Sequence, residues 1–98
     1  MLLKFKDGTT KVCSRPIEHR LMRNGNPAGW ICTVRIAENM SMSEIDQILT
    51  NDNISELTFC NRMAEELFVL SGYTRVANVI IRHSEASAEI EVQFEKNI

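Results

Sequence analysis

Hydrophobic and polar positions alternate most regularly in the last quarter of the chain. From Ala88 to Glu95, apolar residues take every second position and acidic or amide residues take the others, so an extended strand here has one apolar and one polar face. The preceding run, Val76 to His83, is rich in β-branched residues, and the polar segment 84–87 lies between the two. This pattern predicts an antiparallel hairpin whose first strand is the more deeply buried.

Two further hairpins are predicted in the first third of the chain. Asp7-Gly8 is a dipeptide that tolerates the backbone of a tight turn, and Pro16 marks a break before the next strand. The segment 24–29 is the densest turn signal in the chain, with two glycines and a proline. The predicted strands of these two hairpins are Leu2–Lys6, Thr9–Ser14, Ile17–Arg23 and Trp30–Ile36.

A single amphipathic helix is predicted near the middle of the chain. Ser41 and Glu44 have the spacing of a capping box, in which each side chain satisfies a free backbone amide of the other residue. A helix of about ten residues would follow, and it would be marginal unless one side is buried. The residues expected on its buried side are Met42, Ile45, Ile48 and Leu49.

The segment after the helix predicts the remaining hairpin. Ile54–Cys60 alternates as a strand does, whereas Leu67–Leu70 is apolar on both faces, which favours a buried strand. Residues 61–66 fit either a hairpin loop or one helical turn. Four hairpins and one helix predict a single α+β domain, residues 1–98, built mainly of antiparallel sheet with the short helix packed on it.

Composition and charge restrict the classes of partner. The chain has 98 residues, 44% of them hydrophobic and 24% charged, as in ordinary globular domains. A net charge of −2 with scattered basic residues argues against nucleic-acid binding. The nearest basic cluster, Arg15, Arg20 and Arg23 with His19, is interpreted as a solvated strand face. Without a leader or a long apolar run, no membrane partner is expected.

The cysteines and histidines predict neither a metal site nor a catalytic site. Cys13, Cys32 and Cys60 are widely spaced, so no disulfide framework or paired-thiolate zinc motif is indicated. Cys13 and Cys32 with His19 and His83 match no compact zinc module. Cys32 and Cys60 are therefore expected to be small buried hydrophobic residues. No cofactor, small-molecule substrate or catalytic residue is predicted.

The charged residues of the two terminal strands are the candidate protein-interaction site. Glu89, Glu91 and Glu95 share one strand face, which is interpreted as solvated sheet surface able to receive a basic partner. Lys4 and Lys6 lie on the polar face of the first strand. Complementary charge predicts that the two terminal strands pair, either within one chain or between neighbouring copies.

Several short motifs resemble a known group of proteins. They are Phe-x-Asp-Gly-Thr at Phe5–Thr9, a Ser-capped helix leading into Ile54-x-x-Leu57, Gly72-Tyr73-Thr74, and a closing apolar and acidic strand that ends in lysine. This order of elements resembles small proteins encoded among the tail genes of phages and prophages of Gram-positive bacteria.

The resemblance implies a non-enzymatic virion or assembly component, located in the virion or the bacterial host cytoplasm. It has no catalytic residues to carry over. Its partners would be other phage structural proteins or further copies of itself. The alternative is a cytoplasmic adaptor or regulatory domain that binds a protein partner.

Overall fold

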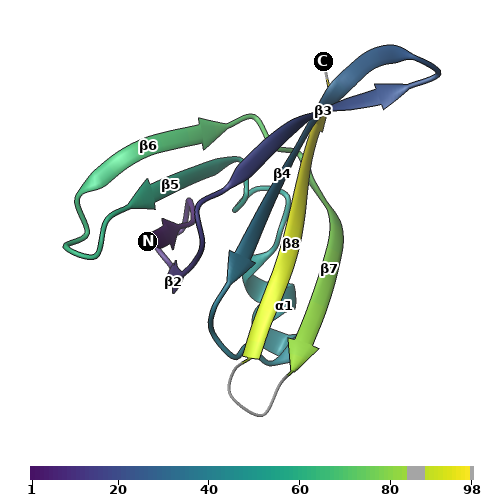
Figure 1. Ribbon diagram of the computed structural model, residues 1–98. Helices are drawn as coiled ribbons and strands as arrows, with labels where there is room; N and C mark the ends of the chain where they lie inside the picture. Colours follow the sequence, from purple (N-terminus) through teal and green to yellow (C-terminus); the bar gives the residue numbers. More distant parts are fainter. Residues whose placement is uncertain (84–87, 98) are drawn as a thin grey trace.

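The computed structural model describes residues 1–83 and 88–97, and it arranges their strands in two sheets (Figure 1). The first sheet, sheet A, has the strand order β2-β1-β5-β6, and the second, sheet B, has the order β3-β4-β8-β7. The elements are β1 (Leu2–Lys4), β2 (Thr10–Val12), β3 (Ile17–Arg23), β4 (Asn26–Ile36), α1 (Met42–Ile48), β5 (Glu56–Cys60), β6 (Glu66–Ser71), β7 (Arg75–His83) and β8 (Ala88–Asn97).

The four predicted hairpins and the α+β class are confirmed. Each hairpin is an antiparallel pair of consecutive strands: β1 with β2, β3 with β4, β5 with β6 and β7 with β8. Two antiparallel pairings between distant segments, β1 with β5 and β4 with β8, join the hairpins into sheets. The strands thus form two separate four-stranded sheets. The polar connection 84–87 lies outside the described residues.

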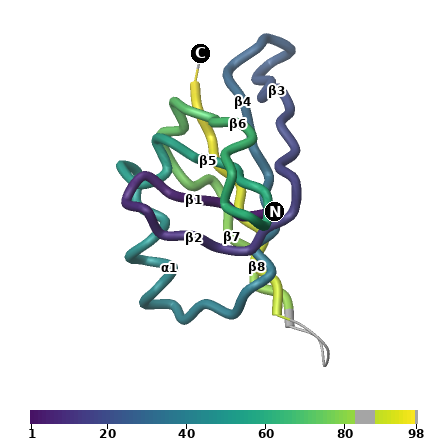
Figure 2. Tube along the Cα trace, turned by 90° about the vertical axis from the view of Figure 1, so that its left-hand side faces the viewer, coloured from purple at the N-terminus to yellow at the C-terminus, as the bar shows by residue number. Residues whose placement is uncertain are grey.

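The hydrophobic core lies between the inner faces of the two sheets, with α1 at one end (Figures 1 and 2). Sheet A contributes the alternating residues of β1 and β5, and sheet B those of β4 and β8. Burying each large apolar side chain contributes roughly 1.5–3 kcal/mol before entropy is subtracted. The most fully buried members are Leu3, Phe5, Cys32, Val34, Ile36, Ile54, Leu57, Phe59, Tyr73, Val92 and Phe94.

The Ser41 half of the predicted capping box is confirmed, whereas the Glu44 carboxylate lies 3.3 Å from Lys11 Nζ. The helix is also shorter than predicted and packs differently. Glu44 N donates to Ser41 Oγ at 3.1 Å, while the helix spans only seven residues. It ends early because the buried Asn53 donates from Nδ2 to the Ile48 carbonyl at 2.7 Å. Ile45 and Ile48 are buried, but the prediction for Met42 is wrong, since it lies in the first turn and is 64% exposed.

Two predictions of strand burial are also wrong. The apolar run 67–70 lies on β6, an edge strand of sheet A, where Leu67 is 51% and Val69 is 40% exposed. In the last hairpin β7 is the edge and β8 is central, so the second strand is the more deeply buried. A run of apolar residues reports how much apolar surface a strand carries but not how many neighbours it has.

The connection between β5 and β6 is a turn and not a helix. Asn61 Oδ1 accepts hydrogen bonds from the backbone amides of Met63 and Glu65, both at 3.0 Å. Ala64 N also donates to the Asn61 carbonyl at 3.0 Å. The side chain of Asn61 therefore replaces the backbone acceptors that a helix would provide.

Gly29 lies at a point where β4 passes close to β8. It pairs with Leu21 on one side and with Asn97 on the other. A Cβ at this position would lie 2.0 Å from the Lys96 carbonyl oxygen, and the φ angle is +154°. Only glycine fits here without moving one of the two strands, and beyond it the β3–β4 hairpin projects from the body of the protein (Figure 1).

Candidate functional site

The five residues predicted to form a protein-interaction site are divided between the two sheets. Lys4 is on β1 and Lys6 follows it, whereas Glu89, Glu91 and Glu95 are on β8 in the other sheet. Lys6 Nζ lies 3.1 Å from Asp52 Oδ1, and both side chains are largely exposed. The structure therefore does not bring the lysines and glutamates together within the chain.

The predicted pairing of the terminal strands is wrong for the folded chain. β1 lies between β2 and β5, and β8 lies between β4 and β7. Both terminal strands are central, so their backbone amides and carbonyls already have partners on both sides. The edges that remain for pairing are on other strands. A protein contact made by the side chains of the five residues stays a prediction.

The acidic face of β8 is paired with arginines and is not the solvated surface expected from its sequence. Arg35 Nε lies 3.3 Å from Glu89 Oε1 and 3.5 Å from Glu91 Oε1. Arg82 Nη2 lies 3.8 Å from Glu91 Oε2. The ion pairs cross from β8 to both neighbouring strands, so positive charge from this chain balances the negative charge of the face.

Glu95 departs furthest from the expected solvated surface, since its side chain is only 4% exposed. Arg23 Nη2 lies 3.2 Å from Glu95 Oε1, and Arg75 Nε contacts Glu95 Oε2. The two arginines come from the far end of β3 and the start of β7. A buried carboxylate needs such partners, yet they are distant in sequence, so the strand pattern alone could not reveal them.

Tyr73 fastens the segment between β6 of sheet A and β7 of sheet B onto sheet B. Tyr73 follows β6, is fully buried, and donates from Oη to Glu18 Oε2 on β3 at 2.6 Å. Its ring meets Phe94 edge-on at 6.3 Å, and Lys96 Nζ lies 4.7 Å from the ring centroid. Burial, the hydrogen bond to Glu18 and nearby negative charge raise the pKa of Tyr73 above its ordinary value.

The cysteines are buried, as the sequence predicted for Cys32 and Cys60. Burial raises the pKa of Cys13 to about 11 and that of Cys32 to about 12. Both groups are thus protonated thiols at neutral pH, whereas the thiolate is the nucleophile and metal ligand. Among the described residues, no group of three or more His, Cys, Asp or Glu side chains is placed to hold a metal ion.

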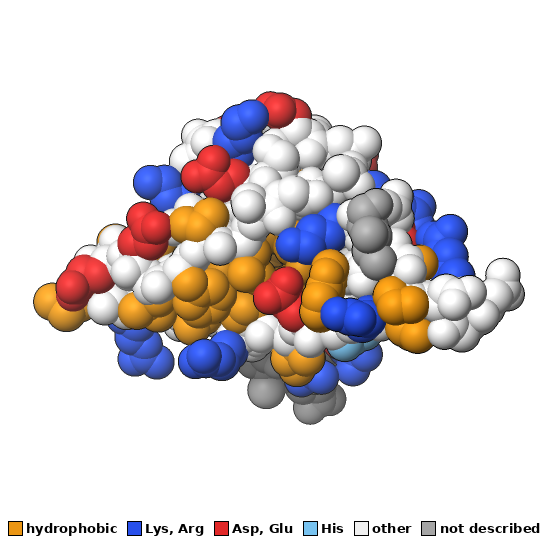
Figure 3. All heavy atoms as spheres, turned by 90° about the horizontal axis from the view of Figure 1, so that it is seen from above, with side chains coloured by type: hydrophobic (Ala, Val, Ile, Leu, Met, Phe, Trp, Pro, Cys, Tyr) orange, Lys and Arg blue, Asp and Glu red, His pale blue; other side chains and the backbone are white. Residues whose placement is uncertain are grey.

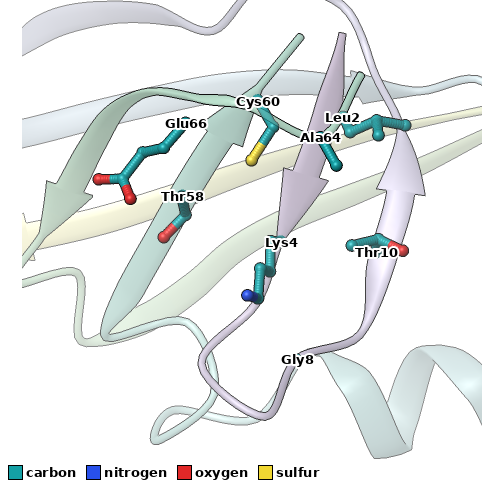
Figure 4. Close-up of a pocket in the computed structure, with 8 residues that line it drawn as sticks. All are labelled: Leu2, Lys4, Gly8, Thr10, Thr58, Cys60, Ala64 and Glu66. Atoms are coloured by element: carbon teal, nitrogen blue, oxygen red, sulfur yellow. The ribbon is translucent and has the colours of Figure 1, made fainter. Parts of the chain in front are cut away.

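The outer face of sheet A carries a shallow hollow of about 280 Å³ between β1, β2 and β5 and the turn that leads to β6 (Figure 4). Lys4 and Glu66 are the charged residues of its lining. The remaining lining residues are Leu2, Gly8, Thr10, Thr58, Cys60 and Ala64. A single cation, a single carboxylate and small side chains form no recognisable catalytic constellation.

Exposed apolar side chains lie on the same sheet face as this hollow and in the turn between β5 and β6. Val12 pairs with Leu2 and Val69 pairs with Thr58 in the strand register, so both lie on the same outer face as the lining residues. We call the exposed residues Val12, Met63, Leu67 and Val69 the sheet A patch. Sequence reasoning missed this patch because it assigned the apolar run 67–70 to the interior.

A second hollow, of about 460 Å³, lies beside the start of β3. Arg15 and the exposed Ile17 border it, together with Thr33 and Arg35 on β4 and Glu91 on β8. Arg35 and Glu91, which form one of the ion pairs of sheet B, thus belong to its lining. The basic cluster predicted here is divided, because Arg20 lies over the Trp30 ring at 5.0 Å and Arg23 pairs with Glu95.

Comparison with protein-family models, with curated proteins and with solved structures found no match for this chain. No helix in the described part of the chain has the length and apolar character needed to cross a membrane.

Proposed function

We propose that this chain is a non-enzymatic structural or assembly protein of a phage or prophage tail, and that it acts through contacts with other proteins. The observation that carries the protein-contact part is the sheet A patch, because Val12 and Val69 are exposed apolar residues on the same outer sheet face and Met63 and Leu67 are exposed in and beside the β5–β6 turn. The phage assignment rests on the resemblance of the motifs around Asp7-Gly8 and Gly72-Tyr73-Thr74.

The buried thiols and the ion pairs on sheet B support a role without catalysis. Two of the three cysteines have raised pKa values, and the pairs on sheet B hold their carboxylates against arginines. A catalytic carboxyl is instead kept ready to exchange a proton with substrate. On this proposal the polar residues set the shape and charge of surfaces.

Gene context and particle composition test the proposal. In a genome that carries this gene, we expect portal, tape-measure or lysis genes beside it, and a metabolic operon would remove the phage assignment. Mass spectrometry of purified particles and tail intermediates from an induced host should detect the chain. Its absence from both, together with an unchanged yield of infectious particles after deletion of the gene, would overturn the proposal.

The second candidate is a cytoplasmic adaptor or regulatory domain that binds a protein partner. The hollow beside β3 favours it, since Arg15 and Ile17 offer one charged and one apolar contact at an exposed strand end. An adaptor would function without particles, so deletion of the gene in a host that carries no inducible phage would still produce a phenotype.

A further inference from the structure

The chain contains two dipeptides in which an acidic or amide residue precedes glycine, Asp7-Gly8 and Asn24-Gly25. Each lies in the turn of a hairpin, the first between β1 and β2 and the second between β3 and β4. In such a dipeptide the glycine nitrogen can attack the preceding side-chain carbonyl carbon and close a succinimide ring. Glycine favours this attack because no Cβ obstructs it. The local sequence makes the two sites alike, so their surroundings decide which of them reacts.

At Asp7-Gly8 the reacting groups are occupied by hydrogen bonds. Gly8 N, the nucleophile, donates to the Phe5 carbonyl at 2.9 Å. Asp7 Oδ1 accepts from Thr9 N at 2.8 Å, and Asp7 N donates to Asn53 Oδ1 at 2.8 Å. The hydrogen bond from the Thr9 amide is the main cause that lowers the pKa of Asp7, and an ionised carboxylate is a poor electrophile. This turn therefore opposes ring closure.

At Asn24-Gly25 these restraints are missing. Within residues 1–83 and 88–97, no hydrogen bond engages the Asn24 side chain or the Gly25 amide. Asn26 Nδ2 reaches only the backbone carbonyl of Asn24, at 3.4 Å. Both residues of the dipeptide are exposed, and a Cβ on Gly25 would meet nothing within 4 Å. The side-chain amide is neutral, so its carbonyl carbon stays open to attack.

Ring closure requires the backbone of Asn24 to rotate out of its present conformation. Asn24 and Gly25 have φ angles of +51° and +77°, as a type I′ turn requires, and Arg23 pairs with Asn26 across it. Figure 3 shows the end of the β3–β4 hairpin standing out at the right-hand edge of the molecule. The register shift after Leu21 also interrupts the regular pairing that holds the turn closed. This turn can therefore open without disturbing the core.

We propose that Asn24 is a site of spontaneous deamidation, with water as the only co-reactant. The Gly25 nitrogen loses its proton to hydroxide or a buffer base and bonds to Asn24 Cγ. The bond from Cγ to Nδ2 breaks, and the nitrogen leaves as ammonia with a proton taken from solvent. Water then opens the succinimide at one of its two carbonyl carbons. Opening at Cγ gives aspartate, and opening at the original peptide carbonyl gives isoaspartate.

Both products change the tip of the hairpin. A neutral amide becomes a carboxylate, so a negative charge appears next to Arg23 in the sequence. In isoaspartate the chain also runs through Cβ and Cγ, which lengthens the backbone of a two-residue turn and removes its I′ geometry. The projecting hairpin thus changes charge and shape as the protein ages. This modification goes beyond the role in assembly proposed above and does not depend on it.

Incubation of the purified full chain at neutral and mildly alkaline pH, followed by peptide mapping, tests the site. The peptide that contains Asn24 should gain the mass difference between an amide and a carboxyl group. The reaction should be faster at the higher pH, because the Gly25 nitrogen must lose a proton. An isoaspartate-specific methyltransferase should label the same peptide and leave the peptide that contains Asp7 almost unlabelled. An intact Asn24, or earlier labelling at Asp7, would overturn the proposal.

Two variants test the route through the succinimide. Asn24→Gln needs a larger and less favourable ring, and Gly25→Ala places a methyl group beside the nucleophile. Each should slow modification at position 24 at least about tenfold. Circular dichroism confirms that each variant is folded. A folded variant that keeps the wild-type rate would show that ring closure is not the route and would refute the proposal.

A comparison with the unfolded chain tests the contrast between the two turns. In guanidinium chloride both dipeptides lose their surroundings, so each gives its own reference rate. Folding should slow the reaction at Asp7 at least about tenfold, and it should slow the reaction at Asn24 by a smaller factor. Equal slowing at the two sites would show that the turn at residues 24–25 is as closed as the turn at residues 7–8. That result would contradict the selective reaction of Asn24.

Discussion

At the scale of single residues, Gly29 shows how one missing side chain sets the distance between two strands. β4 and β8 approach so closely that a Cβ would overlap the Lys96 carbonyl oxygen at 2.0 Å. Gly25 also has a positive φ, +77°, but a Cβ there meets nothing within 4 Å. A substitution at Gly25 therefore measures the free-energy cost of the positive φ alone. A substitution at Gly29 adds the cost of steric overlap with β8.

We expect Gly29→Ala to destabilise the protein by about 3 kcal/mol or more, since both conformational strain and overlap act on it. Gly25→Ala should cost only about 1–2 kcal/mol, from the positive φ alone. Urea denaturation followed by circular dichroism measures both values. Equal losses in the two variants would show that β4 moves away from β8 without penalty.

The buried thiols predict how stability depends on pH. The pKa of Cys13 is raised from 9.0 to about 11, and that of Cys32 from 9.0 to about 12. Above pH 9 the unfolded chain loses these protons while the folded chain keeps them, so folding stability falls as pH rises. Each thiol can lower the free energy of unfolding by about 1.4 kcal/mol per pH unit in that window.

We therefore expect these thiols to contribute almost the same free energy of unfolding at every pH up to about 8.5. From pH 9 to about 11 the free energy of unfolding should fall steeply. Urea midpoints measured across this range test the expectation. Cys32→Ala should be less stable at neutral pH but should show a shallower alkaline decline. A variant with the same alkaline slope as the wild type would show that Cys32 does not titrate in unfolding.

At the scale of elements, the hairpins could be predicted because each depends on local alternation and on turn residues such as Asp7-Gly8. The position of each strand within its sheet could not. The pattern of 67–70 fits a central strand, but β6 is an edge, and the acidic alternation of 88–95 fits exposed surface, but β8 is central. Those positions depend on the pairing of β1 with β5 and of β4 with β8, which no local pattern encodes.

The candidate site shows the same limit. The carboxylates of β8 were found from their spacing, but their arginine partners come from three other strands. The sheet A patch required knowing that Val12 and Val69 share a face. Surface sites of this kind are formed by tertiary arrangement, which a single sequence does not specify directly.

The helix gives a prediction at the same scale. Ile48→Ala should destabilise the protein by about 2–5 kcal/mol, the usual cost of truncating a buried isoleucine. Met42→Ala should change the free energy of unfolding by at most about 0.5 kcal/mol, because that side chain is largely exposed. Denaturation midpoints of the two variants test this contrast, and a negligible change for Ile48→Ala would mean that α1 does not pack on the core.

At the scale of the whole molecule, Tyr73 fastens the segment that joins the two sheets onto sheet B. It lies in the segment between β6 and β7, packs against Phe94 of β8 and hydrogen-bonds to Glu18 of β3. The sheets share one core, so we expect them to unfold in a single cooperative transition.

Tyr73→Phe should lower the free energy of unfolding by about 1–2 kcal/mol through loss of the hydrogen bond to a carboxylate. Tyr73→Ala should lower it by about 3–5 kcal/mol, because a cavity also forms. Fluorescence of Trp30 in sheet B and far-ultraviolet circular dichroism should report the same midpoint. Separate midpoints in Tyr73→Phe would show that the sheets are independent units.

The central position of β8 has a consequence for the time course of folding. During synthesis β4 is made well before β8, the strand that must lie between it and β7. Until Ala88–Asn97 arrives, the edge of β4 that faces β7 has no partner, and the closure of the sheet requires contacts between residues as distant as Gly29 and Asn97. Such non-local pairing slows folding and prolongs exposure of apolar segments. Formation of sheet B therefore stays incomplete until β8 is available to pair with both β4 and β7.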